Sequence, residues 1–260
     1  MDIRAGIPQT DLRDFYEQAY STPDDRFLAW RRLGAAQKVR SILTLTEPGP
    51  ARDPRISSEI AEVIEIGAGT GAILQELSTQ RPNWNLAAVD LAEGSVAAIR
   101  QLGLRNLTES RVADAEHLPF PDKRFDLAIL SHVIEHLPDP AAALREAKRV
   151  ARLVLIEVPV EGTPVLDLIW FIRKHRGRNR VPNELGHLWH YSVREWNRVI
   201  GSAGLTIMAR LQYLLTRDVL LFGKTGRMLR LARVRATGQA ICGTKVWGNL
   251  VHSHYAVLAA

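Results

Sequence analysis

Short apolar runs alternate with segments of helical period through the middle of the chain. The apolar runs predict four strands, at Ala61–Ile66, Asn85–Val89, Phe125–Leu130 and Leu153–Val158. The intervening segments predict helices, at Ala72–Thr79, at Ser95–Gln101 and from Pro140 to about Val150. The last helix has a clear start, because Asp139 stands at the N-cap position and proline follows it at the first helical position. This alternation predicts a doubly wound α/β fold, in which helices cover both faces of a mostly parallel sheet.

Two helices are expected before this alternation begins. They span Asp11–Tyr20 and Asp25–Leu45. In the second helix, apolar residues recur every three or four positions, which is the period of a buried helix face, at Phe27, Trp30, Leu33, Ala36, Val39 and Leu43. The proline-rich segment 47–54 cannot continue a helix and is interpreted as a linker. We therefore expect an N-terminal helical lid over residues 1–46 and the main domain over residues 55–260.

The pattern changes in the last part of the chain. An apolar run begins at Thr163 and ends in a cluster of arginines by Arg180. A helix is expected at Ser192–Ala203 and a final strand at Tyr255–Leu258, and the stretch between them mixes strand-like pieces with basic residues. We expect a basic amphipathic cap, inserted into the main domain at about residues 162–191.

The strongest motif is a glycine-rich turn between the first predicted strand of the sheet and its helix, Val63-Ile-Glu-Ile-Gly-Ala-Gly-Thr-Gly71. Glycines let the backbone take positive φ and approach a ligand closely, and the following helix presents free N–H groups and the positive end of its dipole. The spacing is GxGxG, which differs from the GxGxxG of dinucleotide-binding proteins. Glu65 precedes the first glycine by two residues, and Asp90 ends the next strand, where a carboxylate can accept both hydroxyls of a ribose.

Four motifs follow one another along the chain, at Ile64–Gly71, Val89–Leu91, Ala113–Phe120 and Phe125–Leu137. Together they resemble the successive motifs of class I S-adenosylmethionine-dependent methyltransferases, especially the small-molecule branch that includes quinone-biosynthesis enzymes. The resemblance covers about Ala61–Val158, with a looser match at Gly186–Ser192 and in the helix after it. It implies a Rossmann-like methyltransferase fold with a seven-stranded sheet. It also implies S-adenosyl-L-methionine as the cofactor, with S-adenosyl-L-homocysteine as the product.

The resemblance further implies roles for individual residues. The glycines of the turn would pack against the methionine part of the cofactor, and Glu65 would hold its ammonium group. Asp90 would bind the ribose, and Leu91 and Asp114 would contact the adenine. Two tyrosines of the first predicted helix would close over the cofactor's carboxylate. The full set of implied cofactor-binding residues is Tyr16, Tyr20, Glu65, Gly67, Ala68, Gly69, Gly71, Asp90, Leu91, Asp114, Ala115, Ser131 and His132.

Histidines are the candidate general bases for methyl transfer. A methyl group on a sulfonium is already electrophilic, so the enzyme must align a nucleophile with it, exclude water and, where needed, remove a proton. Four histidines are expected near the carboxyl edge of the sheet, namely His132, His136, His187 and His190. The alternative is that they only shape loops and form structural hydrogen bonds. His252 and His254 are expected to serve the fold, and no metal site is expected, because the chain has one cysteine and no close His–Cys pair.

Charge is unevenly distributed along the chain. Residues 1–159 hold 19 Lys and Arg against 23 Asp and Glu, whereas residues 160–260 hold 15 against 5. The basic part contains clusters at Arg173–Arg180 and Lys224–Arg235, each after apolar residues. Three interpretations stay open: an ordinary solvated cap, a lid for a lipid-linked or phosphorylated acceptor that could also contact an anionic membrane, and nucleic-acid binding. Nucleic acid is not the favoured partner, because no recognised RNA-binding module accompanies the arginines.

Composition adds an expectation about the cellular compartment. Cys242 is the only cysteine, which excludes a disulfide within the chain and favours a reducing cytosol. The first nine residues carry an acid and a proline and lack an apolar core, so no signal peptide is expected. No uninterrupted apolar stretch reaches the ~18–20 residues of a membrane-spanning helix. We expect a cytoplasmic protein, with peripheral membrane contact as the option that the basic cap leaves open.

The sequence as a whole predicts an enzyme that transfers a methyl group from S-adenosylmethionine to a small molecule, with oxygen as the favoured acceptor atom. The alternatives are an RNA or protein methyltransferase, and a subunit that binds the cofactor without catalysis. Against amino-group methylation, Ser131-His-Val-Ile134 stands where many such enzymes carry an Asn/Asp-Pro-Pro-Tyr/Phe tetrapeptide. One departure from the family is the missing Pro-Gly-Gly turn, in whose place Arg149–Val154 runs straight through. The acceptor and the oligomeric state cannot be predicted from the sequence.

Overall fold

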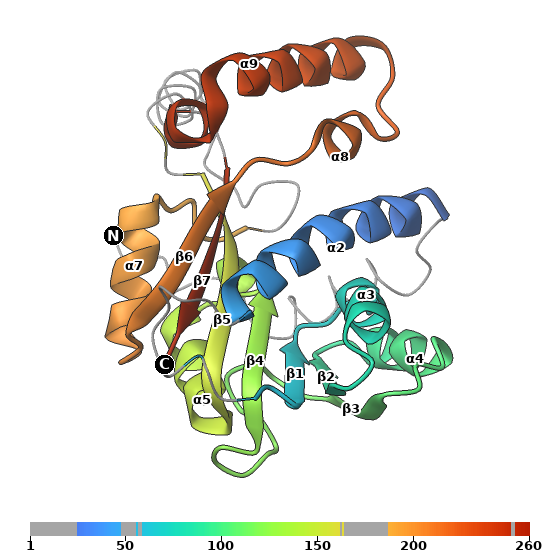
Figure 1. Cartoon of the computed structure of the whole chain (residues 1–260), viewed down its shortest axis with the longest axis vertical. Helices are drawn as coiled ribbons and strands as arrows, with labels where there is room; N and C mark the ends of the chain where they lie inside the picture. Colours follow the sequence, from blue (N-terminus) through green and yellow to red (C-terminus); the bar gives the residue numbers. More distant parts are fainter. Residues whose placement is uncertain (1–24, 48–55, 57–58, 162, 164–186, 251–252) are drawn as a thin grey trace.

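The computed structural model describes residues 25–47, 56, 59–161, 163, 187–250 and 253–260 (Figure 1). Within them, one sheet of seven strands has the spatial order β3-β2-β1-β4-β5-β7-β6. The strands are β1 (Glu62–Ile66), β2 (Asn85–Asp90), β3 (Leu107–Val112), β4 (Phe125–Ser131), β5 (Ala151–Val160), β6 (Ile207–Tyr213) and β7 (Ser253–Ala259). Neighbouring strands from β3 to β5 are parallel, and β7 runs antiparallel between β5 and β6. The predicted doubly wound, mostly parallel, seven-stranded sheet is confirmed.

Helices pack on both faces of this sheet. In the described residues they are α2 (Asp25–Thr46), α3 (Ala72–Gln80), α4 (Glu93–Gln101), α5 (Pro140–Val150), α7 (Val193–Ser202), α8 (Arg217–Leu221) and α9 (Gly226–Leu250), with a 3-10 helix η2 at Ile134–His136. Apolar side chains of α2 and α3 share a core with Val63, whereas those of α5 and α7 share a core with Ile64 and Ile66. Successive residues of a strand point to opposite faces, so β1 contributes to both cores. Glu65 is the exception, an acid in a strand whose other central residues are apolar.

The starts of α5 and α7 follow the capping signals of the sequence. The Asp139 carboxylate accepts hydrogen bonds from the N–H groups of Ala141 and Ala142, at 3.0 and 3.1 Å. Ser192 and Glu195 form a reciprocal capping box at the start of α7. A cap of this kind typically stabilises a helix by about 1 kcal/mol. The capping box also fixes the course of the chain just before α7. That preceding segment carries His187 and His190, two of the predicted site histidines.

Two regions differ from the elements that the sequence predicts. The strand β3 was not expected, because it lies at the edge of the sheet and most of its residues are partly or fully exposed, so it carries no apolar run. The basic stretch Lys224–Arg235 lies mostly in the long helix α9 and not among strand-like pieces. Its arginines interrupt the apolar residues and hide the helical period in the sequence.

The helix α2 confirms the predicted element Asp25–Leu45, but only part of the predicted buried face. Of the residues predicted to be buried, Trp30 and Leu33 are 37% and 39% exposed, whereas Val39 and Leu43 are buried. Figure 1 shows the reason, since the C-terminal half of α2 lies against the sheet and α3 while its N-terminal half extends past them. The apolar period therefore identified the helix and overestimated how much of it is covered.

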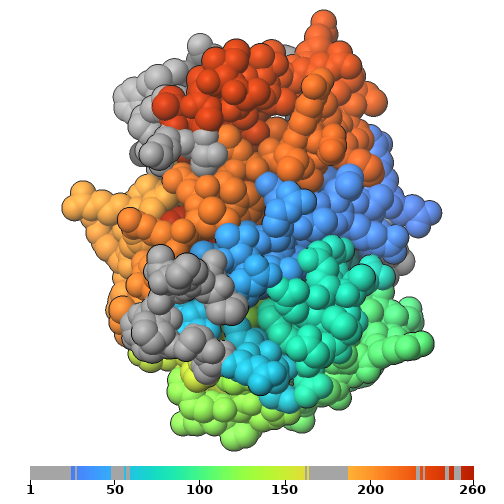
Figure 2. Space-filling model, viewed as in Figure 1, coloured from blue at the N-terminus to red at the C-terminus, as the bar shows by residue number. Residues whose placement is uncertain are grey.

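Several predictions fall outside the described residues. They are the helix Asp11–Tyr20 with Tyr16 and Tyr20, most of the linker, and most of the cap insertion, of which only residues 163 and 187–191 are described. The helices α8 and α9 lie beyond one end of the sheet and form the top of the molecule in Figures 1 and 2. In the described part of the chain, every helix is too short or too polar to cross a membrane.

Candidate functional site

The carboxyl ends of the parallel strands form one edge of the sheet, and ligands of open α/β sheets bind there, where the strand order reverses. In this chain the reversal lies between β1 and β4. The glycine turn leaves β1 at this point, and Gly67, Gly69 and Gly71 have φ values of 71°, 54° and 72°. A Cβ atom on Gly67 would lie 2.5 Å from Val133 Cγ2, so only glycine fits this position. The turn therefore places main-chain atoms of glycines, which have no side chains, at the carboxyl edge of the sheet.

Glu65 is a buried carboxyl group on β1, directly before the glycine turn. Its residue is 3% exposed, and its Oε2 accepts no hydrogen bond from the described residues. Burial raises the pKa of Glu65 to about 8, although the positive charges of Arg31 and Lys38 act in the opposite direction. A buried polar atom without a partner costs free energy, and an ionic ligand group would remove that cost. The site therefore fits the positively charged ammonium group of S-adenosylmethionine.

Asp90, at the end of β2, connects the glycine turn to the neighbouring strand. Its Oδ2 accepts a hydrogen bond from the Gly69 N–H at 2.7 Å, and its Oδ1 accepts one from the Ala92 N–H at 3.0 Å. Burial raises the pKa of this carboxyl group. Each carboxylate oxygen can accept a second hydrogen bond, so Asp90 can hold the turn and still bind ribose hydroxyls.

The other predicted cofactor-binding residues of the described chain follow the same edge. Asp114 accepts a hydrogen bond from the Glu116 N–H at 2.9 Å, and the Ala113 N–H donates to the Asp90 carbonyl at 3.0 Å. Half-buried residues at this part of the edge include Leu91 and Ala115, and Ala68 is buried. Ser131, which is also buried, ends β4. The fold thus gathers at one edge the motif residues that are spread from Glu65 to Ser131 in the sequence.

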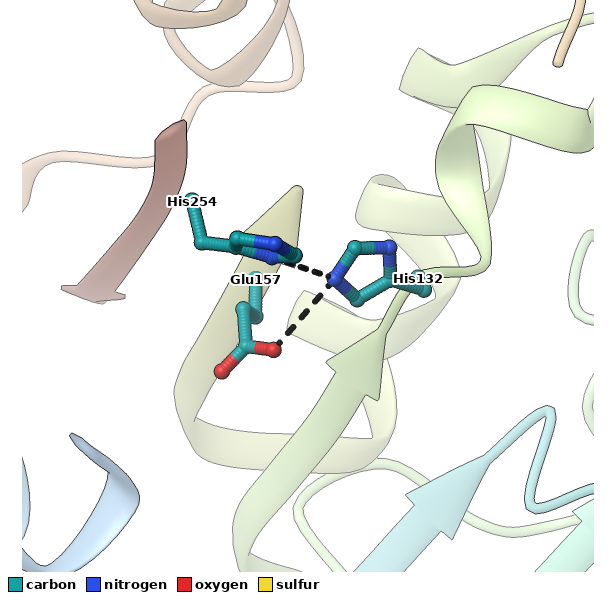
Figure 3. Close-up of side chains that lie close together, drawn as sticks. All are labelled: His132, Glu157 and His254. Carbon is teal, nitrogen blue, oxygen red and sulfur yellow. Dashed lines mark hydrogen bonds and ion pairs between the residues drawn. The ribbon is translucent and has the colours of Figure 1, made fainter. Parts of the chain in front are cut away.

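Three side chains from different parts of the chain meet farther along this edge (Figure 3). His132 follows β4, Glu157 lies on β5, and His254 lies on β7. His132 Nε2 is 2.9 Å from His254 Nδ1 and 3.5 Å from Glu157 Oε1. We call these three residues the His132–His254 cluster. His132 has a φ of 57°, an uncommon value for a residue other than glycine, and such backbone strain is often found at functional sites.

The carboxylate of Glu157 is fully buried and has several partners. The hydroxyl groups of Ser41 and Ser131 donate to its oxygens at 3.0 and 3.2 Å. Lys38 Nζ lies 3.7 Å from Glu157 Oε1 and donates to Ser131 Oγ at 3.1 Å. Burial alone would raise the pKa of Glu157, but the contacts with His132 and Lys38 outweigh it and hold the pKa at about 2. The His132–His254 cluster is therefore built around an ionised glutamate with a complete set of partners.

A second group of histidines surrounds Glu161, just after β5. His187 Nδ1 and His190 Nδ1 lie 3.0 and 2.8 Å from the same oxygen, Glu161 Oε2. Burial alone would raise the pKa of Glu161, but the two histidines outweigh it and hold the pKa well below its usual range. One carboxylate thus orients two imidazole rings that come from the segment before α7.

Glu135, on η2, connects the two groups of histidines. Its Oε1 lies 3.0 Å from His132 Nδ1, and its backbone carbonyl accepts the Leu188 N–H at 2.8 Å. A carboxylate oxygen of Glu135 and ring nitrogens of His136 and His187 lie within 4.8 Å of one another. We call these three residues the Glu135–His187 cluster. The backbone contact holds the segment before α7 against η2, so the cluster is assembled by main-chain structure and not by the side chains alone.

The structure brings all four predicted base candidates to this edge, but divides them between two clusters. Both ring nitrogens of His132 have partners in the His132–His254 cluster and Glu135, while the rings of His136, His187 and His190 group around Glu135 and Glu161. The function of these histidines as bases stays a prediction.

Sequence reasoning missed Glu157 as a site residue and assigned His254 to the fold alone. His254 lies 122 positions from His132 in the chain, and β7 returns it to the edge by antiparallel pairing with β5. No local motif marks it. Glu157 did carry a signal, because an acid inside an otherwise apolar strand is seldom buried without a partner.

Comparison with known proteins agrees with the motifs. A family model described as a methyltransferase domain matches residues 64–153. The chain is 39% identical over 93 residues to malonyl-[acyl-carrier protein] O-methyltransferase of Geobacter sulfurreducens, which is 35% of this chain and 35% of that protein. It is 33% identical over 126 residues to demethylmenaquinone methyltransferase of Lactiplantibacillus plantarum, which is 42% of this chain and 50% of that protein. The matches span half or less of these relatives' length.

A solved structure shares the fold along almost the whole chain. Geranyl diphosphate C-methyltransferase from Streptomyces coelicolor, in complex with Mg²⁺, geranyl diphosphate and S-adenosyl-L-homocysteine, has a TM-score of 0.61 over 98% of both chains. Its sequence identity of 14% supports the fold alone. The cofactor of the matched family is S-adenosylmethionine, and Glu65, Asp90 and the glycine turn suit it. Residues 64–153 thus form a methyltransferase domain, and the motifs and the fold are those of class I S-adenosylmethionine-dependent methyltransferases.

Proposed function

We propose that the chain transfers the methyl group of S-adenosylmethionine to an oxygen of a small molecule with an anionic or lipid-like part. The observation that carries this proposal is the arrangement of one edge of the sheet. Glu65 and Asp90 lie beside the glycine turn, and His132 lies next along the same edge, after β4. A cofactor bound at Glu65 and Asp90 would direct its methyl group toward His132.

The cofactor-binding roles rest on burial and charge. The unpartnered Oε2 of Glu65 binds the ammonium, Asp90 binds the ribose, and the loop of Asp114 and Ala115 receives the adenine. The cofactor's carboxylate needs a positive partner, and Arg31 of α2 is close enough to Glu65 and Asp90 for its charge to oppose the rise in pKa that burial causes in both. This arrangement makes α2 the described part of the lid expected over residues 1–46.

The reaction moves two groups, a methyl and a proton. A lone pair of the acceptor oxygen forms the new bond to the methyl carbon, and the electrons of the S–C bond stay on sulfur, which becomes a neutral thioether. The proton of the acceptor hydroxyl then needs a base. We assign it to the paired rings of His132 and His254, because Glu135 and Glu157 place two fully buried carboxylates beside them and Lys38 supplies one nearby ammonium group. These carboxylates would stabilise the positive charge that forms on a ring as it takes the proton during the reaction.

The nature of the acceptor is inferred from charge and from relatives. The two relatives described above are named for methylation of a malonyl group on acyl-carrier protein and of demethylmenaquinone. The excess of basic over acidic residues in 160–260 suits an anionic acceptor, or an anionic surface that presents the acceptor. We accordingly propose that the protein is located in the cytoplasm and contacts a membrane peripherally.

Ligand-dependent melting tests cofactor binding without knowledge of the acceptor. S-adenosylhomocysteine at 100 times its Kd should stabilise the native protein by about 2.7 kcal/mol. Asp90→Ala should reduce that stabilisation, whereas Asp122→Ala, whose side chain is 76% exposed, should keep it. A protein that melts normally and shows no shift with either S-adenosylmethionine or S-adenosylhomocysteine would falsify the proposed function.

Labelled S-adenosylmethionine separates the proposed enzyme from its alternatives. Incubated with a small-molecule fraction of cell extract, the protein should transfer label to a compound of low mass. Transfer only to RNA, abolished by ribonuclease, or only to protein would replace the proposed acceptor. Cofactor binding without transfer to any fraction would instead support a cofactor-binding subunit.

A further inference from the structure

We propose that Glu135, His136 and His187 bind one divalent transition-metal ion at the carboxyl edge of the sheet. This inference goes beyond the proposed methyl transfer, although the site shares Glu135 with the surroundings of His132, and the sequence did not lead us to expect it. Two histidines and one carboxylate are a set of ligands that zinc and similar ions accept, with open positions left for water or substrate.

The geometry is close to that of a metal centre. The three potential ligand atoms lie within 4.8 Å of one another. Zinc holds nitrogen and oxygen ligands at about 2.0–2.2 Å in tetrahedral geometry, so two ligands of one ion lie about 3.4 Å apart. A pair of ligand atoms at the 4.8 Å limit would have to approach by about 1.4 Å, through rotation of the side chains, to hold one ion. The rings of His136 and His187 already meet edge to face, with centroids 4.9 Å apart.

Glu135 supplies the observation that points to a ligand. Its side chain is fully buried, and its Oε2 accepts no hydrogen bond from any described residue. Among the described residues, its other oxygen, Oε1, forms an ion pair with His132 Nδ1. Leaving a carboxylate oxygen unsatisfied in the interior is expensive, and a cation bound to Oε2 would provide the missing interaction.

Glu161 gives His187 the environment of a metal ligand. A metal-bound histidine almost always donates its second ring N–H to a carboxylate, carbonyl or water, which fixes the tautomer and the ring orientation. His187 Nδ1 makes such a contact with Glu161 Oε2 at 3.0 Å, so Nε2 is the nitrogen that would take the ion. The Leu188 N–H, bonded to the Glu135 carbonyl at 2.8 Å, fixes the spacing between His187 and η2.

The neighbouring His132–His254 cluster is the weaker candidate for the ion. Its ligand atoms are also close together, but Glu157 is already satisfied by Ser41 and Ser131. Lys38 Nζ lies 3.7 Å from Glu157, and a second cation there would be repelled. By contrast, the ion pairs that described residues form with Glu135 and Glu161 all involve histidines.

The ligand set also limits which ion binds. Imidazole nitrogens suit zinc, cobalt, nickel, copper and iron, whereas magnesium and calcium prefer all-oxygen sites. An ion held here would have coordination positions open toward the edge that bears the acceptor. It would polarise an anionic or hydroxyl oxygen there and help to position it.

Cobalt provides a direct test, because Co²⁺ substitutes for zinc and its visible absorption reports coordination. The full chain, stripped with a chelator and dialysed, should bind one equivalent of Co²⁺ or Zn²⁺ by calorimetry, and Co²⁺ should show the intense bands of a low-coordinate site. Glu135→Gln and His187→Gln should each weaken binding ~100-fold, and Glu161→Gln should weaken it by ~10–100-fold, the effect expected of an outer-shell partner. The exposed His117, outside both clusters, provides the matched control, and His117→Gln should bind as the wild type does.

Because Glu135 and His187 are buried, each variant is first melted without metal to establish that it folds. The half-buried His136 provides a second test, since His136→Gln should remove the increase in melting temperature that Zn²⁺ gives the wild type. The proposal is overturned if the wild type binds neither ion. It is also overturned if folded His136→Gln and His187→Gln bind as tightly as wild type. Loss of binding only in His132→Gln and His254→Gln would indicate that the ion binds in the His132–His254 cluster, and it would also reject the proposal.

Discussion

The two sides of the edge that we propose for the cofactor and for the acceptor, the cofactor side and the acceptor side, are built in different ways. The cofactor side comes from consecutive segments of the chain between Glu65 and Ala115, in which the Gly69 N–H of the glycine turn donates to the Asp90 carboxylate. The acceptor side is assembled from α2, the residues after β4, the strand β5 and the distant strand β7. The first presents backbone and one unsatisfied carboxyl group, whereas the His132–His254 cluster is a closed network of side chains.

This difference predicts different responses to change. A ligand should affect the cofactor side most, because the buried Oε2 of Glu65 accepts no hydrogen bond from the described residues until a cation arrives. A mutation should affect the acceptor side most, because each member of a buried network serves several others. Three experiments test or refine this contrast.

The largest effect is expected at Lys38, whose ammonium lies beside the fully buried Glu157. Removing one partner of a buried ion pair leaves a charge uncompensated and typically costs about 3–5 kcal/mol. Lys38→Met should lower the free energy of unfolding by this amount in a denaturant titration, and adding Glu157→Gln should restore most of it. The exposed Arg40, on the same helix, provides the control. Equal stability of Lys38→Met and Arg40→Met would contradict a closed network.

A somewhat smaller effect is expected on turnover. His132→Gln and His254→Gln should each lower methyl transfer to the acceptor by ~10²-fold or more, because general-base catalysis contributes ~10²–10⁴-fold. The affinity of His254→Gln for S-adenosylhomocysteine should stay within a factor of two or so, since this ring lies on the acceptor side and is not among the expected cofactor-binding residues. Near-normal turnover in both variants would mean that the enzyme only aligns the reactants and uses neither ring as a base. A loss of cofactor affinity in His254→Gln would mean that the two sides of the edge are not functionally separate.

The smallest of the three effects concerns the pH dependence of stability through Glu65. Its pKa is about 8 in the folded protein against an ordinary value of 4.5, so the folded state holds the proton more tightly. Stability from this group is therefore complete below about pH 4.5 and is lost as pH rises toward 8. Between pH 5 and pH 7 the loss amounts to about 2.5 kcal/mol, and Glu65→Gln should abolish it.

Glu62 provides the control for this measurement, because it lies on the same strand, is half-buried and has a pKa lowered chiefly by hydrogen bonds from Asn85 and Arg124. Glu62→Gln should keep the wild-type change in unfolding free energy between pH 5 and pH 7. Saturating S-adenosylhomocysteine should flatten the wild-type profile, since its ammonium stabilises the ionised form of Glu65. An unchanged profile in Glu65→Gln would show that another group causes the pH dependence.

The sequence by itself determined most of the sheet and the cofactor side. Apolar runs located β1, β2, β4 and β5 to within a few residues, because parallel strands are buried on both faces and read as continuous hydrophobic segments. Glu65, Asp90 and the glycine turn could be located from the sequence because their position depends on local backbone geometry at the end of a strand. Such geometry is encoded within a few neighbouring residues.

The tertiary structure alone decided the acceptor side. Nothing near His254 in the chain marks it as a partner of His132, and only the antiparallel placement of β7 beside β5 brings the two rings within 2.9 Å. Likewise, Glu135 and His187 come together because a loop before α7 bonds to η2. Contacts between distant residues depend on how whole elements pack, and a local pattern of hydrophobic and polar positions carries no record of that packing.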